Sequence, residues 1–202
     1  MMFDFITILL VGGLLLVAAY TAFQFLGKFP KRTIDDVTPF LRPAEAHEIE
    51  GLLDPAQEAN FRLRLSRDEF TAWQRKRLHL MREYLLRMCH NALVLIEWGN
   101  MESLEEPGSD SARFAERRMR AQELVQAATE FRLYSMLALV KLKVWLLLPS
   151  CFWFLVLSPS LPALRNIFGI NALGSYDRLK NAASGLGSIH SMDFQHNLAA
   201  RL

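Results

Sequence analysis

Hydrophobic residues are concentrated in two blocks of the chain, and charged residues fill the segment between them. Residues 5–27 carry no formal charge, and neither do residues 144–164. Residues 28–143 hold 19 of the 23 Lys and Arg and 18 of the 21 Asp and Glu. This distribution is typical of a membrane-attached protein with a charged, water-facing middle.

The first apolar block is long enough for a transmembrane helix. It has 23 residues, and a helix needs about 20 to cross the hydrocarbon layer. A cleaved signal peptide is the alternative, but its apolar part is usually about 7–15 residues and follows a basic start. No Lys or Arg precedes this block, and no small-x-small cleavage site closes it. The sequence therefore predicts an uncleaved N-terminal transmembrane anchor over residues 1–27.

The basic residues beside the anchor predict its orientation. Residues 1–4 contain no cation, whereas Lys28, Lys31 and Arg32 follow the apolar block at once. Cytoplasmic flanks are enriched in Lys and Arg. We therefore expect the chain in a cell or inner membrane, with its N-terminus outside and its middle segment cytoplasmic.

The region 28–66 is expected to hold a proline-containing connector and short acidic helices. Asp54 followed by Pro55 is typical of a helix N-cap and first turn. Ser66 followed by Glu69 is a capping box, which predicts the start of a helix.

Two long amphipathic helices are expected over 67–132. At about 100° per residue, the apolar residues of 67–99 share one broad face: Phe70, Trp73, Leu78, Met81, Tyr84, Leu85, Met88, Ala92, Leu95 and Ile96. Gly99 and Asn100 suggest a C-terminal stop, and a second helix starts near Asp110 or Ser111. A short connection between long helices predicts an antiparallel hairpin, which would project from the membrane and return to it.

One short stretch of the first hairpin helix is apolar on all sides. Residues 92–96 place Leu93 and Val94 on the otherwise polar face. Apolar residues at these positions are expected to be shielded from water. The linker after the helix could shield them, for instance through Leu104. The other interpretation is a partner contact, for which the candidates are Leu93, Val94, Leu95, Ile96 and Trp98.

Opposite charges lie in adjacent segments of the middle region. Residues 34–60 contain seven Asp and Glu against one Arg, whereas residues 61–88 contain eight Lys and Arg against three Asp and Glu. The favoured interpretation is that the acidic helices dock against the basic start of the long helix. A surface for anionic lipid headgroups is the alternative, with these candidates: Lys28, Lys31, Arg32, Arg75, Lys76, Lys141 and Lys143.

The second membrane-associated segment is expected over 133–164. Its uncharged part from Val144 to Leu157 would be roughly 21 Å long as a helix, and Pro149 should kink it. We favour a second crossing, while a re-entrant or interfacial segment is the alternative. The remaining region, 165–202, is rich in Gly, Ser and Asn, and we expect it to be flexible, with a mobile tail beyond Ser184.

Little in the sequence indicates chemistry. The chain is 51% hydrophobic and 22% charged with a net charge of +2, so nucleic acid is not an expected partner. His79 and Glu83 stand four residues apart on one helix face, but this two-residue match is common by chance. Cys89 and Cys151 suggest reduced thiols. We expect no cofactor, no metal and no enzymatic activity.

The expected fold class is therefore all-α, with an N-terminal transmembrane helix, a water-facing antiparallel hairpin and a second, kinked membrane-associated helix. The expected function is that of an integral membrane accessory, scaffold or assembly protein acting through helix-mediated protein–protein interaction. Its partners would be the lipid bilayer and either another protein or a second copy of this chain. The alternative is an anionic-lipid-binding or membrane-shaping protein.

Overall fold

The computed structural model describes residues 34–44, 51–104, 111–147, 164–165 and 172–202. Within these ranges the regular secondary structure is helical throughout, which confirms the all-α class. The principal helices are α2 (Ile34–Phe40), α4 (Pro55–Arg64), α5 (Arg67–Leu104), α6 (Ser111–Leu147), α9 (Gly174–His190) and α10 (Met192–Arg201). The expected transmembrane anchor over 1–27, with Lys28, Lys31 and Arg32, lies outside the described residues.

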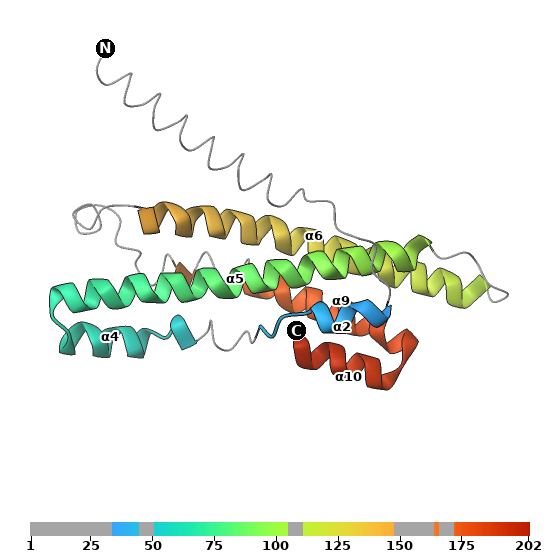
Figure 1. Cartoon of the computed structure of the whole chain (residues 1–202), viewed down its shortest axis with the longest axis horizontal. Helices are drawn as coiled ribbons and strands as arrows, with labels where there is room; N and C mark the ends of the chain where they lie inside the picture. The colour runs from blue at the N-terminus through green and yellow to red at the C-terminus, as the bar shows by residue number, and fades with distance from the viewer. Residues whose placement is uncertain (1–33, 45–50, 105–110, 148–163, 166–171) are drawn as a thin grey trace, which may run out of the picture. The chain divides into compact units, whose positions relative to one another are not determined.

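The antiparallel hairpin expected from the sequence is formed by α5 and α6, the two long helices in Figure 1. They have 38 and 37 residues, which corresponds to roughly 55 Å each. Their facing apolar side chains are buried in the hairpin core: Leu78, Met81, Leu85, Met88, Ala92 and Leu95 from α5, and Ala121, Leu124, Ala128 and Phe131 from α6. The α5 residues are among those that the helical periodicity placed on the apolar face.

The predicted end of α5 at Gly99 and Asn100 is wrong, because the helix continues to Leu104. Gly99 instead allows α5 and α6 to approach each other closely. A Cβ at this position would lie 2.8 Å from Val125 Cγ2 and 3.1 Å from the carbonyl oxygen of Ala121. The glycine therefore serves helix packing rather than helix termination.

Both predicted helix starts are confirmed. Asp54 caps α4, its Oδ1 accepting a hydrogen bond of 2.9 Å from the Ala56 amide. Ser66 and Glu69 form the reciprocal capping box before α5. The Ser66 amide donates to Glu69 Oε2 at 2.9 Å, and the Glu69 amide donates to Ser66 Oγ at 3.4 Å.

The C-terminal region is not the flexible segment expected over 165–202, because its residues from Gly174 onward form α9 and α10. α9 packs against α6 and α10. Its residues at helical spacing are buried on one face: Tyr176, Leu179, Ala183 and Leu186. Gly187 is buried against α10, where a Cβ would be in ordinary van der Waals contact with Leu198 and Gln195. The small residues in this part of the chain therefore do not prevent helix formation.

The second apolar block is described only up to Leu147. Residues 133–147 continue α6 without a break, whereas the expected kink at Pro149 lies outside the described residues. None of the helices in the described ranges combines the length and the apolar character needed to cross a bilayer.

Candidate interaction surfaces

The five residues expected to contact a partner do not form one exposed patch. Val94, Leu95 and Trp98 are buried inside the chain, at 2% exposure or less. Leu93 and Ile96 are half-buried. Leu104, the expected cover from the linker, is itself 70% exposed. The apolar stretch of α5 is therefore covered by other parts of the same chain.

The C-terminal helices provide this cover at Trp98. The Trp98 ring lies against His190, the last residue of α9, with ring centroids 6.0 Å apart. Phe194 of α10 meets the same ring edge-on, at a centroid distance of 5.4 Å. Sequence reasoning missed both contacts because His190 and Phe194 fall in the segment expected to be a tail.

A buried carboxylate, Glu102, joins three helices beside Trp98. Its Oε1 accepts a hydrogen bond of 2.8 Å from Trp98 Nε1, and its Oε2 accepts one of 2.6 Å from Arg117 Nε of α6. His190 Nε2 lies 3.3 Å from the same Oε2. Burial alone would raise the pKa of Glu102, but His190, Trp98 and Arg117 together hold it below its ordinary value. We call these four residues the Glu102 cluster.

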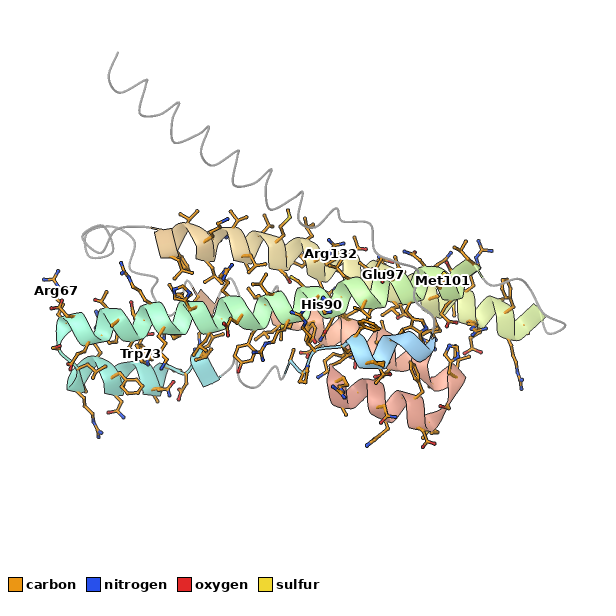
Figure 2. All side chains as sticks on the ribbon, viewed as in Figure 1. Arg67, Trp73, His90, Glu97, Met101 and Arg132 are labelled. Carbon is orange, nitrogen blue, oxygen red and sulfur yellow. The ribbon has the colours of Figure 1, made fainter. Side chains whose placement is uncertain are left out.

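A buried guanidinium, Arg77, lies near the other end of α5. Arg77 Nη1 is 2.8 Å from Glu58 Oε2 of α4, and its Cζ lies 4.7 Å from the centroid of the Trp73 ring. Figure 2 shows Trp73 on the side of α5 that faces α4, where its ring contacts Phe61 at 4.9 Å. This ion pair links the acidic segment 34–60 to the basic segment 61–88.

Asn91 holds the extended segment that follows α2. Its Oδ1 accepts a hydrogen bond from the Arg42 amide, and its Nδ2 donates to the Arg42 carbonyl oxygen, both at 2.8 Å. Nearby, burial raises the pKa of the Cys89 thiol to about 12 and that of the Tyr176 hydroxyl to about 12. Cys89 therefore stays protonated at neutral pH and is not an activated nucleophile.

The outward side of α5 carries a sparse row of exposed or half-buried apolar residues, which we call the α5 stripe: Leu86, Leu93 and Leu104. Leu86 is 38% exposed, Leu104 is 70% exposed and Leu93 is half-buried. Separations of seven and eleven residues return a helix to nearly the same face. Leu93 belongs to the partner contact expected from the sequence, whereas Leu86 and Leu104 were not part of it.

The described lysines and arginine expected at lipid headgroups fall into two pairs. Arg75 and Lys76 lie near the start of α5, and Lys141 and Lys143 lie near the end of α6. Lys76 and Lys141 are exposed, whereas Arg75 and Lys143 are half-buried. Because α5 and α6 are antiparallel, the two pairs lie toward the same end of the hairpin, on neighbouring helices.

The last pair lies beside an apolar row on α6, which we call the α6 stripe: Leu133, Met136, Leu137, Val140 and Val144. Leu133 and Leu137 are 54% and 51% exposed, and the other three are half-buried. The opposite face of this part of α6 is buried, as Ala138, Leu139 and Leu142 show. An outward apolar row of this kind was not expected from the sequence, which suggested only a membrane-inserted block.

A polar groove of about 450 Å³ lies between α6 and α9. Its charges occur as pairs, with Arg178 and Glu130 2.9 Å apart and Arg120 and Glu123 3.3 Å apart. The groove therefore presents no excess of either sign. His79 and Glu83 are exposed on α5, and no group of three or more metal-binding side chains is found among the described residues.

Comparisons of this chain with protein-family models, with curated proteins and with solved structures found no match.

Proposed function

We propose that this chain is an integral membrane accessory or scaffold protein that acts through helix-mediated protein–protein interaction. In this proposal the segments 5–27 and 144–164 attach it to a cell or inner membrane. The N-terminus lies outside, and the α5–α6 hairpin presents its helices on the cytoplasmic side. The enzymatic and cofactor classes gain no support from the side-chain arrangements described above.

The observation that carries the proposal is the continuity of α6. This single helix runs from the charged hairpin through the apolar residues that begin at Leu133 and ends at Leu147. The uncharged run of the sequence starts within the same helix, at Val144. Since a continuous helix is a stiff element, the position of the apolar segment would be transmitted directly to the packed hairpin.

The α5 stripe supports the interaction part of the proposal. Leu86 and Leu104 are exposed and Leu93 is half-buried, and helix-in-groove partners read apolar residues that recur on one helix face. The contact surface proposed here is therefore the α5 stripe, since Val94, Leu95 and Trp98 already pack inside the chain.

Membrane attachment is tested by alkaline carbonate extraction of membranes from cells that express the full chain. We expect the chain to stay in the membrane pellet, as integral proteins do. Complete release into the supernatant would contradict the proposal. Protease protection of a tag at the N-terminus, compared with a tag after Leu202, then tests the orientation of the anchor.

The interaction is tested by cross-linking the full chain in membranes and comparing two triple variants. Leu86→Ser, Leu93→Ser and Leu104→Ser together should remove a cross-linked species. The matched control changes three exposed apolar residues on other helices, Leu63, Met119 and Met192, to Ser. Loss of the species in both variants, or in neither, would overturn the α5 stripe as the contact surface.

A second candidate function is binding of anionic lipids, which Lys141 and Lys143 beside the α6 stripe favour. Cations close to a membrane surface contribute about 1 kcal/mol each to binding of acidic lipids. The two functions are compatible, since a scaffold can also rest on the membrane that holds it.

A further inference from the structure

The α6 stripe points to a lipid surface as its occupant. We propose that these residues, with Lys141 and Lys143, lie on a bilayer that contains acidic lipids. The second half of α6 then lies along the membrane surface, in contrast to the projecting hairpin expected from the sequence. This inference rests on the proposed membrane attachment and adds the surface of contact and the orientation of the hairpin.

The first step is the change in composition along one face of α6. The exposed residues Gln122, Gln126 and Thr129 occupy, in the first half of the helix, the face that carries the α6 stripe in the second half. Spacings of four, seven and eleven residues from Leu133 keep these side chains on that face. The outward face therefore changes from polar to apolar within one continuous helix. In both halves the opposite face is buried, with Leu124 and Ala128 in the first half and Ala138 and Leu142 in the second. Packing against the hairpin core does not require the outward face to be apolar. We therefore attribute the apolar residues on this face to a contact with something outside the described fold.

The second step is the position of the lysines. Lys141 and Lys143 lie about 80° to either side of the centre of the α6 stripe, at about 100° per residue. Lys141 is exposed. An apolar row flanked by a cation on each side is a pattern of helices that lie in the membrane interface, with the apolar face below the headgroups and the cations among them. The charge of these lysines favours acidic lipids over a second apolar protein surface.

The third step distinguishes a helix that lies on the membrane from one that crosses it. Leu133 and Val144 are eleven residues apart, or roughly 16 Å along the helix axis. Over this length only one side of α6 is free of the hairpin, because Ala138, Leu139 and Leu142 are buried on the other side. Lipid can therefore reach this part of α6 from one side, as it does when a helix lies in the membrane surface. The uncharged sequence from Val144 to Leu164 continues directly from the stripe.

The test uses nitroxide spin labels on the full chain in vesicles that contain phosphatidylglycerol. One label is placed at Leu137→Cys, in the α6 stripe, and the matched label at Gln126→Cys, on the same face of the same helix. Both variants carry Cys151→Ser, while the buried Cys89 stays protonated and unlabelled. We expect the label at 137 to be at least tenfold less accessible to a water-soluble nickel complex than the label at 126, while staying open to oxygen.

Each outcome of this experiment decides between occupants. Equal access of nickel to both labels overturns the contact of the α6 stripe with lipid. Protection of the label at 137 from both nickel and oxygen shows that protein covers it, either residues 5–27 or a second copy, and overturns the proposal too. Flotation of the same samples distinguishes failure of the lipid contact of the α6 stripe from failure of the proposed membrane attachment. A chain that floats with an unprotected label retains the proposed membrane attachment, whereas a chain that does not float refutes both.

The requirement for acidic lipid is measured by repeating the experiment in vesicles of phosphatidylcholine alone. We expect the protection of the label at 137 to fall severalfold there, and also in phosphatidylglycerol vesicles when Lys141→Gln and Lys143→Gln are introduced together. Protection that is equal in all three samples overturns the role of the lysines and of acidic headgroups.

Discussion

The two ends of the α5–α6 hairpin each bury one charge, and they do so in different ways. Near the connection between the helices, Glu102 accepts hydrogen bonds from Trp98 and Arg117 and lies close to His190. Near the start of α5, Arg77 pairs with Glu58 and stacks on Trp73. The first charge joins three helices, whereas the second attaches one short helix to α5.

The difference shows how the number of partners relates to structural role. A buried charge is costly unless hydrogen bonds and opposite charges compensate for its lost hydration. Both oxygens of Glu102 have such partners, so the cluster can hold α5, α6 and α9 together at moderate cost. Arg77 has its Nε and Nη2 atoms buried without a hydrogen-bond partner in the described part of the chain. The ring of Trp73 compensates part of this cost. We therefore expect the connection end to be the more stable end of the hairpin.

The largest effect is expected when the Glu102 cluster is broken. Glu102→Ala leaves Arg117 and His190 without their shared carboxylate and should lower the free energy of unfolding by about 3–5 kcal/mol. Urea unfolding of the full chain in mild detergent, followed by tryptophan fluorescence, measures the change. Glu123→Ala is the control, because its exposed carboxylate should matter by about 0.5 kcal/mol or less. Equal losses in the two variants would refute a structural role for the cluster.

A smaller loss is expected at the other end. Glu58→Ala leaves the buried Arg77 guanidinium without its carboxylate. It should cost about 3 kcal/mol, the low end of the range for breaking a buried ion pair, because the Trp73 ring stays against the guanidinium. Gln57→Ala, an exposed neighbour on α4, serves as the control. The same urea titration shows which of the two substitutions lowers the free energy of unfolding more. If Glu58→Ala destabilises more than Glu102→Ala, then the comparison above is wrong.

The close approach of the two helices is tested by a single methyl group. In Gly99→Ala the new Cβ meets Val125 Cγ2 at 2.8 Å. Overpacking costs about 1–3 kcal/mol, and the higher helix propensity of Ala returns about 1 kcal/mol. We expect a net loss near 1 kcal/mol. Gly174→Ala should instead be neutral or stabilising, because a Cβ there has no neighbour within 4 Å among the atoms surveyed. A gain in stability for Gly99→Ala would contradict the packing role.

The smallest effect is a pH dependence at the connection end. The pKa of Glu102 in the folded chain lies below the ordinary value of 4.5. Its contribution to stability is therefore fully present above pH 4.5 and is lost as the pH falls through the lowered folded pKa. The stability advantage of the unmodified chain over Glu102→Gln should shrink between pH 6 and pH 3 in thermal unfolding scans. If the difference in stability between the two chains stays constant over that pH range, then the ionised Glu102 carboxylate is not the source of the stability advantage.

Sequence reasoning found the parts of the candidate surfaces that depend on local patterns. The adjacent acidic and basic segments predicted that the short helices dock against the start of α5, and the ion pair of Arg77 with Glu58 is such a contact. The Glu102 cluster was missed, because Glu102 follows a glycine that suggested a helix end and His190 lies in a segment of small residues. The helical spacing of Tyr176, Leu179, Ala183 and Leu186 was the available signal for α9.

The sequence by itself determined the all-α class, the two hairpin helices and their starts. These features follow from periodicity and from capping bonds between residues two or three positions apart, such as Ser66 and Glu69. Only the tertiary structure decided where α5 ends, that Trp98 is covered and that an apolar row of α6 faces outward. Trp98 and His190 are far apart in the chain, as are Gly99 and Val125. Such contacts depend on how helices approach one another in space, which no local pattern of residues specifies.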